Sequence, residues 1–146
     1  MFRTIGLFSV CLLFMASAWA QSPIGIWKTI DDETNQPKSL VEIFEKDGKL
    51  YGKVTKLFRG PDEDPDPVCD KCDEDDPRYN KKVVGMQILE GLEKESDTEW
   101  ENGKILDPKN GSIYSCYIVL EEPNKLKLRG FIGFSLLGRT QYWHRQ

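Results

Sequence analysis

Polar and apolar residues alternate near the end of the chain. One set of alternate positions holds Leu126, Leu128, Gly130 and Ile132, and the other holds Lys125, Lys127, Arg129 and Phe131. A period of two predicts a β-strand with one buried face and one solvent face. The chain then turns between Gly133 and Gly138 and returns as an aromatic segment that ends at Arg145. We therefore expect a last hairpin whose final strand pairs with a first strand at Gly25–Ile30.

A second hairpin is predicted in the first half of the chain. Leu40–Phe44 and Leu50–Leu57 are separated by Asp47-Gly48, a dipeptide that adopts the positive φ angles of a tight turn. Further along, Val83–Leu92 favours a strand, because Gly85 would weaken a helix.

Two Asn-Gly dipeptides predict further hairpin turns. Asn102-Gly103 should join Thr98–Trp100 to Lys104–Leu106, and Asn110-Gly111 should lead into the strand Ser112–Glu121. Strand, turn and strand thus repeat to the end of the chain. This pattern predicts an all-β fold, a single antiparallel meander of about eight or nine strands that closes into a barrel and so removes its exposed edges.

Residues 1–20 have the pattern of a secretory signal peptide. Arg3 precedes an apolar run from Ile5 to Ala16, and Ala18-Trp19-Ala20 is an A-x-A cleavage site. The run is shorter than the ~20 residues that a membrane-spanning helix needs. We therefore expect a periplasmic or secreted protein with no transmembrane segment after cleavage, in which residues 21–146 form a single β-barrel domain.

Charge and cysteine content narrow the classes of partner. The chain has 20 Lys and Arg against 24 Asp and Glu, and loss of Arg3 with the signal changes the net charge from −4 to 19 − 24 = −5. Nucleic acid is therefore not expected as a partner, because phosphate binding needs an excess of basic residues. The mature chain keeps three cysteines, so at least one sulfur is free, pairs between chains or binds a metal.

A long segment, Gly60–Lys82, interrupts the strand pattern between the third and fourth expected strands. It is rich in proline and carries nine carboxylates between Asp62 and Asp76. We expect an exposed, solvated acidic loop. Its carboxylates lack the spacing around a central glycine that an EF-hand calcium loop has.

Within this loop, Cys69-Asp70-Lys71-Cys72 suits a zinc half-site, a redox couple or a local disulfide. Zinc takes about four ligands, and only Cys116 and His144 remain as sulfur or imidazole donors outside the loop. A redox cysteine needs surroundings that lower its pKa, whereas an acidic loop raises it. We expect a Cys69–Cys72 disulfide and a buried free thiol at Cys116. A disulfide to Cys116 and a metal- or thiol-dependent function at this loop are the alternatives.

Catalytic chemistry has little support in the sequence. His144 is the only histidine, it lies two residues from the end, and no Gly-x-Ser-x-Gly nucleophile motif is present. We expect a binding or envelope protein more than an enzyme, with no cofactor and no bound metal.

Aromatic side chains on the expected strands supply candidate ligand contacts. In a barrel of about eight strands, the inward set either fills the interior or lines one small cavity. The candidate contacts are Tyr51, Trp100, Tyr114, Tyr117 and Tyr142, with Arg129 as an anchor for a ligand carboxylate if its face is lumenal. The predicted function is binding of a small apolar or amphipathic ligand. The alternative is a cell-envelope interaction or structural module, with a filled core and an exposed contact surface that includes the acidic loop.

A glycine two residues before a tryptophan in the first strand, Gly25-x-Trp27, together with an arginine in the last strand, resembles the lipocalin and calycin arrangement. The resemblance implies that Trp27 plugs one end of the barrel and that a basic side chain packs over it. We assign barrel closure to Trp27, Arg139 and Trp143 on this basis.

A second resemblance covers nearly the whole mature chain and rests on short motifs in a fixed order. They are Gly25-Ile26-Trp27, Asp47-Gly48-Lys49-Leu50-Tyr51-Gly52, Cys69-Asp70-Lys71-Cys72, Gly103-Lys104-Ile105-x-Asp107-Pro108-x-x-Gly111-x-x-Tyr114, Arg129-Gly130-Phe131-Ile132-Gly133 and Gly138-Arg139-Thr140-x-x-Trp143. This succession resembles the bacterial exported family known as domain of unknown function 2147. It implies a Gram-negative periplasmic or secreted protein, and it brings no established activity or catalytic residues.

Overall fold

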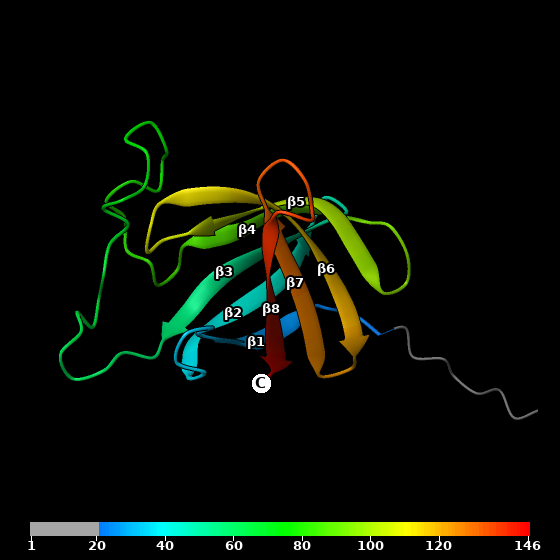
Figure 1. Ribbon diagram of the computed structural model, residues 1–146, viewed down its shortest axis with the longest axis horizontal. Coiled ribbons are helices and arrows are strands. Elements are labelled where there is room, and N and C mark those ends of the chain that lie inside the picture. The colour runs from blue at the N-terminus through cyan, green and yellow to red at the C-terminus, as the bar shows by residue number, and fades with distance from the viewer. Residues whose placement is uncertain (1–20) are drawn as a thin grey trace, which may run out of the picture.

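The computed structural model describes residues 21–146, and the expected signal peptide lies outside the described residues. Eight antiparallel strands run in chain order around a closed barrel (Figure 1). They are β1 (Gly25–Ile30), β2 (Pro37–Lys46), β3 (Lys49–Leu57), β4 (Gln87–Lys94), β5 (Glu99–Asp107), β6 (Ser112–Glu122), β7 (Lys125–Phe131) and β8 (Gly138–Arg145). The predicted all-β meander, closed by its first and last strands, is confirmed. Within residues 21–146, no helix has the length and apolar character needed to cross a bilayer.

Two expected strand boundaries are wrong. Asn102-Gly103 is not a hairpin turn, because both residues lie inside β5, where Asn102 has a φ angle of 59° and the pairing with β6 shifts register between Trp100 and Gly103. The positive φ angle that suits a turn also suits a β-bulge, and the two cannot be told apart from the dipeptide alone. The fourth strand begins at Gln87 rather than Val83, after Gly85 turns the chain with a φ angle of 91°.

Inward-facing side chains pack one end of the barrel. Alternate strand positions point inward, and at these positions the following residues are buried: Trp27, Val41, Ile43, Leu50, Val54, Leu89, Leu92, Trp100, Cys116, Ile118, Leu120, Leu126, Leu128 and Trp143. Trp27 and Trp143 are 0 % and 1 % exposed. Because large aromatic rings and branched aliphatic chains occupy these positions, the end of the barrel where β1 begins and β8 ends has a packed core.

The barrel closes through a short seam between β1 and β8. These strands pair at two positions, Trp27 with Arg145 and Lys28 with His144, whereas the β7–β8 pairing extends over seven. Arg145 reinforces the seam, because its guanidinium lies 4.4 Å from the centre of the Trp27 ring. The same guanidinium donates hydrogen bonds to the carbonyl oxygens of Pro123, Ile24 and Ser22, at 2.8, 2.9 and 2.7 Å. One side chain thus joins the plug tryptophan, the β6–β7 turn and the segment that precedes β1.

The assignment of Arg139 to barrel closure is therefore wrong, and Arg145 takes that role. Arg139 lies at the opposite end of β8, where its side chain is exposed and its Nε lies 3.4 Å from Oδ2 of Asp32. Both arginines fit the pattern of a basic residue in the last strand. The direction of β8 decides which one reaches Trp27.

Arg145 should contribute more to stability than an ordinary surface arginine. Arg145→Ala should lower the free energy of unfolding by about 2–3 kcal/mol, because a cation–π contact and charge-assisted hydrogen bonds are lost together. Arg145→Lys should recover less than half of this loss, since one ammonium cannot reach three carbonyl oxygens and stack on the ring. Urea denaturation measures the effect, and Arg139→Ala is the matched control, expected within about 0.5 kcal/mol of the parent. Equal effects of the Arg145 and Arg139 substitutions would contradict this role.

Candidate functional site

The six candidate ligand contacts do not form one site. Trp100 and Tyr114 lie on the inward face, Trp100 buried and Tyr114 half-buried opposite Ile105. Tyr51 lies on the outer face, where its ring stacks against Phe44 at 5.9 Å between centroids.

The other three candidates, Tyr117, Arg129 and Tyr142, also point outward. Tyr117 pairs with Arg129 across β6 and β7 on the face opposite the buried Ile118 and Leu128. Tyr142 is 42 % exposed on β8. The face of Arg129 is therefore not lumenal, and Arg129 cannot anchor a ligand inside the barrel.

All three cysteine side chains within residues 21–146 are buried, as expected for sulfur atoms with a structural role. The predicted Cys69–Cys72 disulfide is confirmed, with the two Cα atoms 5.4 Å apart, and Cys116 is a free, buried thiol as expected. Cys69 and Cys72 are 0 % and 5 % exposed, so a thiol partner has no open approach to the disulfide. Burial raises the pKa of the Cys116 thiol to about 12. A group with this pKa and no exposure is a poor nucleophile at neutral pH.

The long loop between β3 and β4 is more closely packed than expected. Its carboxylates are mostly exposed, but Val83 and Met86 are buried along with the disulfide. The loop packs against the β5–β6 turn. There the carbonyl of Lys71 lies so close to Gly111 that a Cβ atom at this position would not fit. Within the predicted loop, Gly60–Lys82, most residues are exposed and only the two cysteines are buried, while Val83 and Met86 anchor the end of the connection to the barrel.

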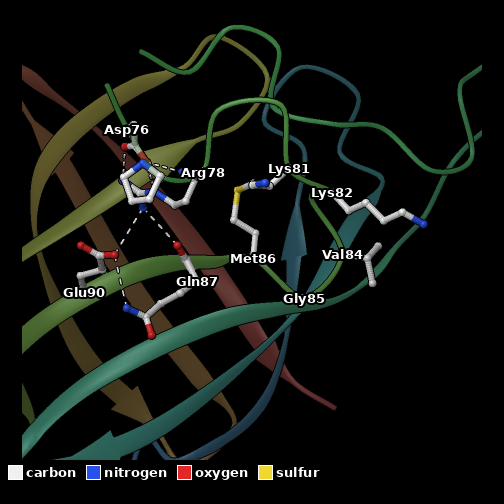
Figure 2. Close-up of a pocket in the computed structure, with 10 residues that line it drawn as sticks. Asp76, Arg78, Lys81, Lys82, Val84, Gly85, Met86, Gln87 and Glu90 are labelled. Carbon is white, nitrogen blue, oxygen red and sulfur yellow. Dashed lines mark hydrogen bonds and ion pairs between the residues drawn. The ribbon is translucent and has the colours of Figure 1, made fainter. Parts of the chain in front are cut away.

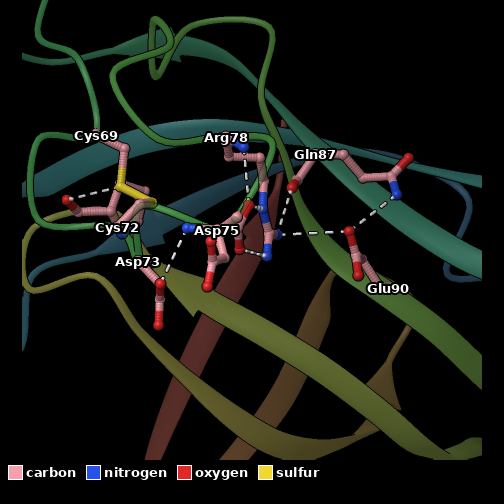
Figure 3. A network of polar contacts seen from close by, with 9 residues as sticks. Cys69, Cys72, Asp73, Asp75, Arg78, Gln87 and Glu90 are labelled. Carbon is pink, nitrogen blue, oxygen red and sulfur yellow. Dashed lines mark hydrogen bonds and ion pairs between the residues drawn. A yellow bond between two sulfur atoms is a disulfide. The ribbon is translucent and has the colours of Figure 1, made fainter.

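Arg78 holds this loop to β4 (Figure 3). Its Nε and Nη2 donate to the two carboxylate oxygens of Asp76, at 2.9 and 2.7 Å, and its Nη1 donates to the carbonyl of Gln87 at 3.1 Å. Glu90 lies 3.4 Å from the same guanidinium. Hydrogen bonds from Arg78 hold the pKa of the Asp76 carboxyl below its ordinary value. These contacts use all three nitrogens of the guanidinium, so Arg78 ties the loop to β4.

A groove of about 550 Å³ lies beside this network on the outer surface (Figure 2). Its walls are formed by loop residues that include Lys81 and Val84 and by Gln87 and Glu90 of β4. Among residues 21–146, no three His, Cys, Asp or Glu side chains come together in a way that could hold one metal ion. His144 is exposed on the outer face of β8, level with Lys28 on one side and Lys125 on the other.

The most unusual surface feature is the loop between β7 and β8, residues 132–137, which we call the tip loop. It projects beyond the ends of β7 and β8 (Figure 1). Four of its six residues are large and apolar, and Ile132, Phe134, Leu136 and Leu137 are 68 %, 72 %, 89 % and 69 % exposed. Single exposed apolar residues are common on soluble proteins, whereas a contiguous group of this kind is typical of an interaction site.

Arg129 holds the tip loop in this conformation. From the outer face of β7, its Nε donates to the carbonyl of Ser135 at 2.8 Å and its Nη2 to the carbonyl of Leu136 at 3.2 Å. Its Nη1 donates to Oγ1 of Thr140 at 3.0 Å, which ties the loop to β8 as well. The apolar side chains are thus presented outward by a fixed backbone.

A basic and aromatic surface continues from the tip loop along β7. We call it the basic face, and it consists of the outward side chains of Lys125, Lys127, Arg129, Tyr117 and Tyr142. Lys125 lies 4.6 Å from the centre of the Tyr142 ring and 3.4 Å from Glu121. The alternation in the sequence predicts that the residues of β7 share one strand face, but it does not show that this face is the outer one. The tip loop could have been found from the sequence, because its apolar residues form a run inside an expected turn.

A family model described as "Uncharacterized protein conserved in bacteria (DUF2147)" matches residues 25–145. The chain belongs to this family. Among solved structures, the chain is similar to protein HP1028 from the human pathogen Helicobacter pylori, which is described as belonging to the lipocalin family. The two are 21 % identical with a TM-score of 0.73, over 86 % of this chain and 83 % of that one. No curated protein matches the chain. The lipocalin-like fold is thus confirmed.

Loss of Arg129 should loosen the tip loop without opening the barrel. In Arg129→Ala the carbonyls of Ser135 and Leu136 lose their donor, so backbone order parameters over residues 132–137 should fall from about 0.85 to below about 0.6. Lys127→Ala, on the same face of the same strand, is the control and should leave these values unchanged. NMR relaxation measures the effect, and a rigid tip loop in Arg129→Ala would show that the arginine does not hold it.

Proposed function

We propose that this chain is an exported, non-catalytic envelope protein that docks onto an apolar partner surface through its tip loop. The observation that carries the proposal is a contrast in burial. Trp27 and Trp143 are sealed inside the barrel, while Phe134 and Leu136 are 72 % and 89 % exposed on a loop that Arg129 holds in place. In this proposal the barrel is a rigid scaffold and the tip loop is its contact element. Export rests on the signal pattern in residues 1–20 of the sequence.

The packed interior favours docking over storage of a ligand inside the barrel. A lipocalin-like barrel that encloses a ligand needs space at its inward positions. Here Leu126, Ile118 and Leu92 are fully buried and occupy those positions together with the tryptophans. Buried sulfur atoms likewise disfavour a thiol-dependent function at the Cys-x-x-Cys loop.

A second candidate function is binding of a small apolar ligand at the other end of the barrel. One observation supports it: Ile105 and Tyr114 face inward and are only half-buried, and Gly130 beside them contributes no side chain. The barrel of the H. pylori protein, which is described as a lipocalin, agrees with this candidate in fold alone.

Docking should place the exported chain with the membrane fraction of the cell. A double substitution, Phe134→Ser with Leu136→Ser, should move the chain to the soluble fraction of gently lysed bacteria, because it removes apolar area from the tip loop. Val68→Ser with Val84→Ser is the matched control, since these residues are 41 % and 40 % exposed on the long loop. The control should sediment with membranes like the parent, as followed by immunoblotting of the fractions. A parent chain that is wholly soluble, or a tip-loop variant that still sediments, would refute docking.

A further inference from the structure

We propose that the surface recognised by the tip loop is a phospholipid bilayer that contains anionic lipid, with the basic face lying against the headgroups. This inference rests on the proposed docking function and names its partner. In this arrangement the tip loop enters the outer part of the hydrocarbon region, and the side chains of β7 remain at headgroup level. Three properties of the described residues favour lipid over a protein pocket.

The first property is that the tip loop satisfies part of its own backbone. The amide of Phe134 donates to the carbonyl of Ile132 and the amide of Leu137 to the carbonyl of Phe134, each at 3.0 Å. Arg129 covers the carbonyls of Ser135 and Leu136. A protein interface supplies hydrogen-bond partners across it. A lipid interior offers no such partners, so a loop that enters it needs these internal bonds.

The second property is the order of apolar and basic residues. No charged residue lies between Arg129 and Arg139, and these two arginines flank the tip loop at its base. Farther along the basic face, Lys127 lies between Val119 of β6 and Tyr142 of β8, so no carboxylate flanks it across the sheet. Apolar residues at the tip with guanidinium and ammonium groups behind them match the layers of a bilayer, in which phosphates lie above the acyl chains.

Aromatic residues occupy the same level as these cations. Tyr117 and Phe131 lie 6.4 Å apart between ring centroids on the outer face, and Tyr142 lies on the neighbouring strand. Tyrosine is enriched where a protein meets the membrane–water interface, because its ring is apolar and its hydroxyl is polar.

The third property is the separation of charge around the barrel. The loop with nine carboxylates between Asp62 and Asp76 joins β3 to β4, which lie across the eight-strand ring from β7 and β8. The β1–β2 connection, next to β8 in the ring, carries Asp31, Asp32 and Glu33, of which Asp32 is paired with Arg139. Although the chain is acidic overall, β7 carries Lys125, Lys127 and Arg129 on its outer face and no carboxylate, so this face is the one that can lie against an anionic surface.

Vesicle flotation tests the inference with lipid as the only partner. The purified mature chain should float with phosphatidylcholine vesicles that contain phosphatidylglycerol, and binding should weaken in high salt. The Phe134→Ser, Leu136→Ser double variant should bind at least about tenfold more weakly, since two large apolar groups no longer enter the lipid. Lys127→Gln should bind about fivefold more weakly, the effect expected for one basic residue at an anionic surface.

Two controls separate lipid recognition from general effects of charge and folding. Lys46→Gln removes an exposed lysine from the end of β2, away from the basic face, and should bind like the parent. Near-UV circular dichroism should show that every variant keeps the tertiary structure of the parent.

If the parent does not float, or if the tip-loop and Lys127 variants float as the parent does, the bilayer is not the partner. When that result accompanies membrane sedimentation that still depends on the tip loop in cells, docking stands and the partner is a membrane protein. When sedimentation is also lost, both proposals fall.

Discussion

Closure of the barrel at the β1–β8 seam is the constraint on which the rest of the structure depends. Only two residue pairs join these strands, so backbone hydrogen bonds at the seam are few. Arg145 compensates by stacking on Trp27 and by holding the segment before β1 and the β6–β7 turn. Because β8 is fixed in this way, β7 and β8 form part of a rigid wall rather than a free hairpin. A free hairpin with an apolar turn would collapse onto itself or aggregate.

The rigid wall explains how four large apolar side chains can stay exposed. Arg129 projects from the outer face of β7 and binds two loop carbonyls and Thr140, so the loop backbone has a fixed path away from the core. The long acidic loop is anchored by different means, a buried disulfide and the Arg78 network, on the opposite side of the ring. The acidic loop and the apolar tip loop therefore leave the same end of the barrel from opposite sides of the ring.

Much of the fold could be predicted from the sequence, because alternation and turn dipeptides are local signals. The first strand, the hairpin at Asp47-Gly48 and the antiparallel meander are predicted in this way, and the Cys69–Cys72 disulfide is predicted from the short spacing of its cysteines in a loop. The errors arose where a local signal has two structural meanings. A positive φ angle at Asn102 fits both a turn and a bulge, and either Arg139 or Arg145 fits an arginine of the last strand. The candidate ligand contacts failed for a related reason, since a period of two separates the faces of a strand without saying which face is inside.

The central claim is that this barrel makes contact through its outer tip and not through its interior. A methyl NMR spectrum of residues 21–146, titrated with a lipid extract of bacterial envelope, tests that claim most directly, because such an extract supplies both a bilayer surface and small apolar ligands. Docking predicts broadened methyl signals for Ile132, Leu136 and Leu137 and an unchanged signal for the inward Ile105. A shift of the inward Ile105 signal, with the tip loop unaffected, would contradict it and identify a ligand inside the barrel.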